Sequence, residues 1–134
     1  MFTYKVKEVT KIVDGDTVDV IIDLGFGLTK KERVRVAGID APETRTRDLS
    51  EKALGLEAKE FIREKLDTDN IIIRTEKEGK YGRILGWLYT DEYSISINEI
   101  MVIKGYAWEY EGGSREKDYE LLKELRQKDG SWSE

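Results

Sequence analysis

The sequence predicts an α+β protein built on a small five-stranded β-barrel that is packed by three α-helices. Five segments show the strand pattern, in which apolar residues alternate or cluster between turn-forming residues. One segment with helical spacing lies between the third and fourth strands, and two more follow the fifth. This order is consistent with an OB-type barrel, which has five strands and binds nucleic acid on one face. The length of 134 residues suits one domain spanning residues 1–134.

The first three strands are expected over residues 4–13, 17–24 and 33–39. The turn between the first two contains an Asp-Gly pair, which readily adopts the positive φ of a hairpin. Pro42, the only proline, follows the third strand and ends it by removing a backbone donor. Strict alternation puts Arg35 and Asp40 on opposite faces of this strand. They can share a site only if the strand bends, and Gly38 is where a bulge would allow this.

Ser50 is expected to cap the first helix, with Leu49 and Leu54 at the two staple positions around it. The buried stripe of this helix would contain Leu54, Ala58, Phe61, Ile62 and Leu66. The fourth and fifth strands are expected over residues 71–75 and 83–89.

The two remaining helices lie in the last third of the chain. Ser96 and Glu99 form the pattern of a capping box for a helix over residues 97–104, and Gly105 supplies its C-terminal stop. Ser114 is expected to cap the last helix, whose stripe is Tyr119, Leu122 and Leu125. Between these helices, residues 108–110 are expected to form an exposed extended segment.

Composition excludes several classes of site. The chain has neither cysteine nor histidine, which excludes disulfides, thiolate metal sites and a histidine general base. Any metal must therefore be bound through oxygen, which favours Ca²⁺, Mg²⁺ or Mn²⁺. No apolar run approaches the ~18 residues of a membrane span, so we expect no membrane contact. The N-terminus lacks a signal-peptide pattern, so the chain is either intracellular or the mature form of a secreted or membrane-anchored protein.

Charge is unevenly distributed along the chain. The net charge of -5 argues against a generic nucleic-acid binder, because affinity for phosphates comes largely from Lys and Arg. Residues 30–47 nevertheless carry six basic side chains against three acidic ones. This segment is either a solvated face or a local basic rim on an acidic body.

Asp16, Asp40 and Glu43 form the candidate carboxylate set. A hard cation such as Ca²⁺ takes six to eight oxygen ligands, and the backbone carbonyl of Ala41 would be a natural third protein donor. With so few carboxylates we expect a weak site, with a Kd of roughly 10⁻⁴–10⁻³ M. The alternative is that Asp14 and Asp16 only shape the hairpin turn.

Two arginines and several aromatic residues are candidates for binding a polynucleotide. Arg35 and Arg83 could each bind a phosphate through paired donors, or they could pair with neighbouring carboxylates in a surface network. Tyr81, Trp108 and Tyr110 could stack on a nucleotide. For Trp108 and Tyr110 the alternative is packing against the last helix.

The chain resembles the staphylococcal nuclease (thermonuclease) family in the order and spacing of its motifs. The matching segments are Val13–Val18, Arg35–Glu43, Lys80–Arg83, Asn98-Glu99, Gly105–Ala107 and Trp132–Glu134. The resemblance implies an OB-fold barrel and a Ca²⁺-dependent endonuclease that acts on DNA and RNA, in single-stranded or unwound form, as a monomer. The implied reaction is attack by water on a phosphodiester, which breaks the 5′ P–O bond and leaves a 3′-phosphate.

The resemblance also implies roles for individual residues. Asp16 and Asp40 would bind the metal directly, together with the Ala41 carbonyl. Glu43 would contact metal-bound water as the proposed general base. The residues that would contact the substrate are Arg35 and Arg83 at the scissile phosphate, Lys80 and Tyr81 at a terminal phosphate, and Trp108 and Tyr110 at base and sugar. The alternative is an OB-fold module that binds nucleic acid or protein without catalysis.

Overall fold

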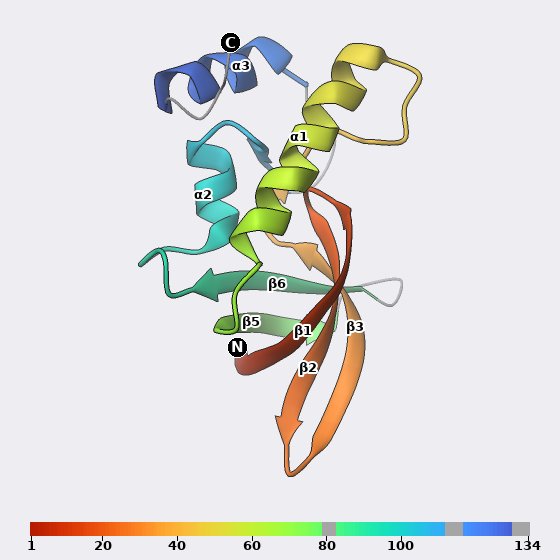
Figure 1. The fold of residues 1–134 in the computed structure, drawn as a ribbon, viewed down its shortest axis with the longest axis vertical. Coiled ribbons are helices and arrows are strands. Elements are labelled where there is room, and N and C mark those ends of the chain that lie inside the picture. Colours follow the sequence, from red (N-terminus) through yellow and green to blue (C-terminus); the bar gives the residue numbers. More distant parts are fainter. Residues whose placement is uncertain (79–82, 112–116, 130–134) are drawn as a thin grey trace.

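The structure is a computed structural model that describes residues 1–78, 83–111 and 117–129, with the backbone alone for Lys77, Glu78, Arg83, Lys128 and Asp129. Five strands close into a barrel in the order β1-β2-β3-β6-β5. These strands are β1 (Phe2–Asp14), β2 (Thr17–Gly25), β3 (Leu28–Val36), β5 (Ile71–Glu78) and β6 (Arg83–Thr90). The predicted five-stranded barrel with three helices is therefore confirmed. The helices gather at one end of the barrel, and the β2–β3 hairpin extends from the other end (Figure 1).

Within the barrel, four of the five strand pairs are antiparallel, and the pair β3–β6 is parallel. This parallel pair sets Arg33 beside Arg83 and Arg35 beside Leu85. The segment from the end of β3 to β5 contains the crossover helix α1 (Leu49–Lys65), as a parallel connection requires. The parallel pair thus joins the strand that carries Arg35 to the strand that begins at Arg83.

The predicted third strand is wrong at both ends. Strand β3 begins at Leu28 and ends at Val36. The chain then turns at Gly38, which has a φ of 76°, and Ile39–Asp40 forms the separate strand β4 that pairs with β7 (Trp108–Glu109). The expected bend at Gly38 exists, but it is a turn between two sheets rather than a bulge within one strand.

Branched apolar side chains fill the barrel, and α1 covers its open end through Ala58 and Ile62. The predicted cap of α1 is wrong by two residues: the Asp48 carboxylate accepts from the backbone N–H groups of Ser50 and Glu51 at 3.0 and 3.3 Å. Leu49 is exposed, so it does not form the expected staple with Leu54. The helix begins earlier because Asp48 offers the same kind of side-chain oxygen as Ser50.

The capping box of α2 (Ile97–Ile103) is confirmed, and Gly105 ends this helix with a φ of 82°. Helix α3 (Tyr119–Asp129) begins where the Asp118 carboxylate accepts from the backbone N–H of Leu121 at 3.1 Å. The predicted cap at Ser114 lies outside the described residues. None of the described helices combines the length and apolar character needed to cross a membrane.

Arg126 anchors α3 to the rest of the molecule. Its side chain is 0% exposed, and its Nε donates to the carbonyl of Gly105 at 2.8 Å. Its Nη1 donates to Glu57 on α1 at 3.1 Å, and the guanidinium lies 4.3 Å from the centre of the Tyr106 ring. This one residue therefore ties together α1, the end of α2 and α3.

Candidate active site at the end of strand β3

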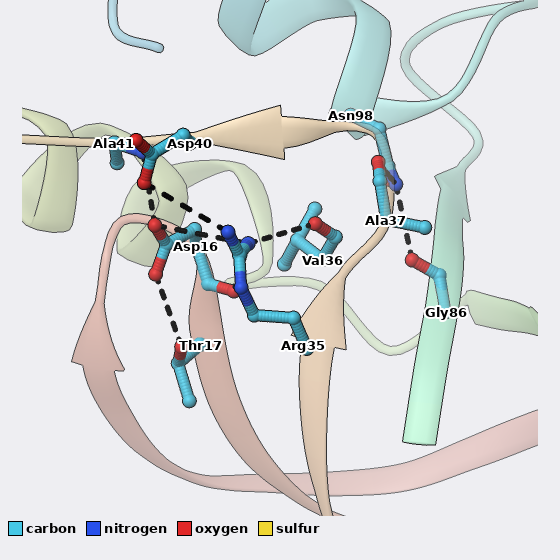
Figure 2. Close-up of polar contacts among 9 residues, drawn as sticks. All are labelled: Asp16, Thr17, Arg35, Val36, Ala37, Asp40, Ala41, Gly86 and Asn98. Atoms are coloured by element: carbon cyan, nitrogen blue, oxygen red, sulfur yellow. Dashed lines mark hydrogen bonds and ion pairs between the residues drawn. The ribbon is translucent and has the colours of Figure 1, made fainter. Parts of the chain in front are cut away.

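Three charged residues from separate elements meet where β3 leaves the barrel (Figure 2). Asp16 lies in the turn between β1 and β2, Arg35 lies near the end of β3, and Asp40 ends β4. The register pairs Thr17 with Arg35, so the turn and the strand end are neighbours in the ladder. Strict alternation would have put Arg35 and Asp40 on opposite faces of one strand. The turn at Gly38 instead brings Asp40 to the same side as Arg35.

The Asp16 carboxylate is held in one orientation by two hydrogen bonds. Its Oδ1 accepts from the Thr17 hydroxyl at 3.0 Å, and its Oδ2 accepts from the backbone N–H of Ala41 at 2.9 Å. The second bond ties the β1–β2 turn to the segment that follows β4. Hydrogen bonds to an ionised carboxylate are stronger than neutral ones, so they fix the relative position of Asp16 and Asp40.

Arg35 lies between the two carboxylates. Its Nη1 donates to the carbonyl of Val36 at 3.1 Å and to that of Asp16 at 3.3 Å. Its guanidinium nitrogens lie 3.7 Å from Asp16 Oδ2 and 3.8 Å from Asp40 Oδ1. These two distances exceed the usual 2.7–3.2 Å of a hydrogen bond. At these distances the opposite charges attract one another without a short hydrogen bond between Arg35 and either carboxylate.

Small residues bring helix α1 into direct contact with both acidic segments. A Cβ added at Gly15 would lie 2.9 Å from the Cβ of Ala58 and 3.0 Å from the Cβ of Ala41. A Cβ added at Gly55 would lie 2.6 Å from the carbonyl oxygen of Glu43. Helix α1 thus packs directly against the Asp16 turn and the backbone at Glu43. Neither Gly15 nor Gly55 has room for a larger side chain.

Asn98 fixes the point where β3 turns toward β4, and the residue patterns did not single it out for this role. Its side chain is buried and donates to the carbonyls of Ala37 and Gly86 at 2.8 and 3.0 Å (Figure 2), while its Oδ1 accepts from the N–H of Leu88 at 3.0 Å. The available signal was an amide between Ile97 and Ile100 in an apolar helix, because a buried amide must find partners.

A second polar group, also not predicted, joins α1 to the start of α3. Glu51 is buried, and its Oε2 accepts from Tyr119 Oη at 2.8 Å and from Lys117 Nζ at 3.1 Å. Burial raises the pKa of Glu51, but hydrogen bonds from Tyr119, Lys117 and Thr46 outweigh it and hold the pKa below its ordinary value. The hydrogen bond to Glu51 raises the pKa of Lys117, and the charges of Glu43 and Asp40 add to this effect. Lys117 therefore lies within electrostatic reach of the candidate site.

The structure brings together two of the three predicted carboxylates. Asp16 and Asp40 both lie beside Arg35, whereas Glu43 is exposed. Within the described part of the chain no three acidic side chains lie close enough together to hold a metal ion. The chain continues beyond Asp40 through Pro42, whose carbonyl lies against Gly55, and this path leads Glu43 to the surface.

The expected exposure of Trp108 is wrong. Trp108 is 1% exposed, its Nε1 donates to the carbonyl of Asp118 at 3.0 Å, and its ring meets that of Tyr119 edge-on. The alternative of packing against the last helix therefore holds for Trp108. Tyr110 is half-buried, and its backbone N–H donates to the carbonyl of Gly38 at 2.9 Å.

The other predicted substrate contacts lie outside what the structure describes. This holds for Lys80 and Tyr81 as whole residues and for the side chain of Arg83. The backbone of Arg83 is described, and it pairs with Arg33 two residues from Arg35.

A comparison with models of known protein families shows to which family the chain belongs. The model of the family described as "Staphylococcal nuclease homologue" matches residues 33–131, which include Arg35, Asp40, Glu43 and Arg83. The chain belongs to the staphylococcal nuclease family.

Three named proteins are similar to most of this chain. A protein named micrococcal nuclease from Shigella flexneri is 35% identical over 138 residues, which cover 95% of this chain and 73% of the relative. Protein ParB from Escherichia coli is 33% identical over 138 residues, covering 95% and 72%. A thermonuclease from Staphylococcus hyicus is 32% identical over 107 residues, covering 78% and 57%. The two relatives that are named as nucleases support a nuclease function.

The chemistry of the donors at this candidate site fits a hard cation. The chain has no histidine or cysteine, and the carboxylates of Asp16 and Asp40 already converge on one positive charge, the Arg35 guanidinium. Carboxylate and carbonyl oxygens are the ligands that Ca²⁺ and Mg²⁺ prefer. Two carboxylates with one backbone carbonyl would leave most coordination positions to water or substrate.

Proposed function

We propose that this protein is a Ca²⁺-dependent endonuclease that hydrolyses phosphodiester bonds of DNA and RNA. The observation that carries the proposal is the convergence of the Asp16 and Asp40 carboxylates on the Arg35 guanidinium, at 3.7 and 3.8 Å, where β3 leaves the barrel. The family membership and the nuclease names of the relatives support it.

In this proposal, Asp16 and Asp40 hold Ca²⁺ together with the carbonyl of Ala41. When bound, the ion would polarise a phosphoryl oxygen and neutralise negative charge that develops during the reaction. Arg35 binds the scissile phosphate, because its donors are only loosely engaged by the neighbouring carboxylates and a phosphate oxygen accepts stronger bonds. Glu43 accepts a proton from the attacking water as general base.

The other substrate contacts extend this proposal. Arg83 shares the scissile phosphate with Arg35, while Lys80 and Tyr81 bind a terminal phosphate and Tyr110 packs on the nucleotide. Water attacks phosphorus and the 5′ P–O bond breaks, so the products carry a 3′-phosphate and a 5′-hydroxyl. We propose a single catalytic domain that acts as a monomer on single-stranded or unwound substrates.

The test is hydrolysis of single-stranded DNA with added Ca²⁺, against a chelator control and with the variant Glu43→Ala in parallel. Removing a general base typically costs about 10²–10⁴ in rate, so we expect little cleavage by the variant or in chelator. Glu60→Ala is the matched control, because Glu60 is an exposed glutamate on α1 that pairs with Arg63. Equal cleavage by Glu43→Ala and Glu60→Ala would refute the assigned base.

A folded wild-type protein that binds single-stranded DNA without hydrolysing it would favour the alternative function, a non-catalytic OB-fold binding module. Thermal unfolding of each variant separates loss of activity from loss of fold. Cleavage in chelator that equals cleavage in Ca²⁺ would refute the proposed metal dependence while leaving the nuclease function intact.

A further inference from the structure

The tip of the β2–β3 hairpin presents three large apolar side chains to solvent. Leu24 is 43% exposed, Phe26 is 103% exposed and Leu28 is 61% exposed. The hairpin extends away from the helices and beyond the closed part of the barrel (Figure 1). Isolated exposed apolar residues are common on protein surfaces, but a cluster of this kind at one tip indicates an interaction site.

The backbone of the tip holds Phe26 in an unfavourable conformation. Gly25, Phe26 and Gly27 all have positive φ, at 82°, 56° and 77°, and the Asp23 carboxylate fixes the turn by accepting from the N–H of Gly25 at 2.8 Å. Glycine adopts positive φ freely, whereas a bulky side chain does so at a cost. Phe26 makes no compensating contact with a core, so folding of the turn does not explain an aromatic residue there.

A basic row leads from this tip to the candidate site. Strand β3 carries Lys30, Lys31, Arg33 and Arg35 against Glu32, a net charge of +3 in a chain whose net charge is -5. Val34 and Val36 are buried inside the barrel. By the two-residue period of a strand, Lys31, Arg33 and Arg35 therefore share the outer face.

The middle residue of this row is held in position by the neighbouring strand. Arg33 donates to both oxygens of Asp19 at 2.8 and 3.0 Å and stays 47% exposed. The pairing partly neutralises Arg33, and the carboxylates of Asp16 and Asp40 partly neutralise Arg35, so the positive charge of the row depends mainly on Lys31.

The length of the row fits an oligonucleotide. Arg35 lies seven positions after Leu28 along β3, which is about 23 Å at the rise of a β-strand. A stacked nucleic-acid strand rises about 3.4 Å per nucleotide, so about seven nucleotides would reach from the site to the tip. Proteins bind single strands with this combination of a basic track along the backbone and an aromatic side chain on which a base stacks.

We propose that the β2–β3 hairpin is a substrate-binding arm for single-stranded nucleic acid. A strand bound at Arg35 runs along the outer face of β3, where Lys31 contacts its backbone, and a base about seven nucleotides away stacks on Phe26. The inference rests on the proposed nuclease function and adds a contact far from the scissile bond. A lipid surface could also accept an apolar tip, but the continuity of the basic row with the candidate site favours the nucleic acid.

The test compares Phe26→Ala with wild type on single-stranded substrates of 3 and 16 nucleotides in Ca²⁺. Loss of one stacked base corresponds to about a tenfold change or more in affinity. We therefore expect the KM for the 16-mer to rise about tenfold, with kcat unchanged, while KM and kcat for the 3-mer stay at wild-type values. Lys31→Ala should raise the KM for the 16-mer by a smaller factor.

Phe2→Ala is the matched control, because Phe2 is an exposed aromatic residue at the start of β1, 56% exposed. Three results would overturn the proposed arm. They are an unchanged KM with Phe26→Ala, an equal change in KM for both substrate lengths, and the same change in KM with Phe2→Ala. Phe26-dependent binding to phosphatidylserine vesicles without any effect on the 16-mer would also overturn it, in favour of a lipid surface.

A second measurement keeps the arm testable if wild type cleaves neither substrate. Fluorescence anisotropy of a labelled 16-mer then reports binding alone, and weaker binding by Phe26→Ala than by Phe2→Ala supports the arm although the nuclease proposal fails. Equal binding by both variants overturns the arm independently of catalysis.

Discussion

Two arginines in this molecule lie between acidic groups and backbone carbonyls, yet their surroundings differ. Arg126 is fully buried, and it donates to Gly105 and Glu57 at 2.8 and 3.1 Å while its guanidinium lies over the ring of Tyr106. Arg35 is 18% exposed, and its nitrogens stay 3.7 and 3.8 Å from the nearest carboxylate oxygens. Arg126 meets its carboxylate at hydrogen-bond distance, whereas Arg35 hydrogen-bonds to two backbone carbonyls and meets its two carboxylates only at longer range.

In our proposal, this difference separates a structural arginine, Arg126, from one that binds the substrate, Arg35. A buried charge must be fully paired because its desolvation is expensive, and the surroundings of Arg126 meet that requirement within the protein. The side chain of Arg35 is partly exposed, and its two ion pairs are longer than the one between Arg126 and Glu57. In our proposal, these distances, rather than the presence of acidic neighbours, distinguish the two roles.

The largest expected effect is on catalysis by Arg35→Gln. An arginine that stabilises a transferring phosphoryl group can contribute about 10³–10⁵ in rate, so we expect cleavage of single-stranded DNA to fall by a factor in this range. The free energy of unfolding should change by only about 1 kcal/mol, because Arg35 makes two modest hydrogen bonds to backbone carbonyls. Steady-state kinetics and urea unfolding of the same preparation check both expectations.

Arg35→Lys separates the contribution of the positive charge from that of the paired donors. It keeps the charge and loses the paired donors, so we expect activity between that of wild type and Arg35→Gln. A large loss of stability in either variant would contradict the comparison, because it would make Arg35 a structural residue like Arg126.

The next effect in size is the loss of stability in Arg126→Ala. The change removes a buried charge together with its hydrogen bonds to Gly105 and Glu57 and its contact with Tyr106. We expect a loss of about 3–5 kcal/mol in the free energy of unfolding, which is a large part of the 5–15 kcal/mol typical of a domain. Urea unfolding measures this loss, and a change below about 1 kcal/mol would show that α3 is held mainly by its apolar stripe.

The smallest expected effect is on the pH dependence of stability, through Glu57, the carboxylate that pairs with Arg126. Burial raises the pKa of Glu57, and the charge of Arg126 offsets only part of this rise. Between the ordinary value of 4.5 and the raised value, the unfolded chain loses this proton before the folded protein does. The contribution of Glu57 to stability is therefore present below this window and is lost as pH rises through it.

We accordingly expect Glu57→Gln to gain stability relative to wild type as pH rises from about 3.5 to about 7. The gain should stay small, because the Glu57 carboxylate is 42% exposed and water screens it. Urea unfolding of both proteins at the two pH values gives the difference directly. A variant that instead loses stability relative to wild type with rising pH would show that Arg126 depends on the ionised Glu57.

Local patterns predicted much of this fold from the sequence. The alternation in β2 and the box of Ser96 and Glu99 depend on residues close in the chain, so they could be recognised without tertiary information. The start of α1 was placed wrongly because Asp48 and Ser50 both suit a cap. The choice between them depends on how the preceding loop packs, which a local pattern does not contain.

The missed features are contacts between distant parts of the chain. Trp108 was expected to be exposed in a segment that also contains Glu109 and Glu111, but Asp118 and Tyr119 at the start of α3 cover it. Arg126 lies one helical turn after the buried Leu122. The sequence pattern did not indicate that Arg126 is buried, because its partners come from α1 and the end of α2. The candidate site shows the same limit: residue types indicated Asp16, Arg35 and Asp40, but only the turn at Gly38 explains how they meet.

The parallel pairing of β3 with β6 has a consequence for the order of events during translation. The ribosome releases Asp16, Arg35 and Asp40 early, but the barrel cannot close until β6 has emerged and paired with β3. Pairing across such a long stretch of chain is slow compared with hairpin formation. The nascent chain, which is surrounded by ribosomal and messenger RNA, therefore carries an incomplete site. We expect the ability to cut nucleic acid to appear only after β6 has left the ribosome, so the RNA that directs synthesis is protected until then.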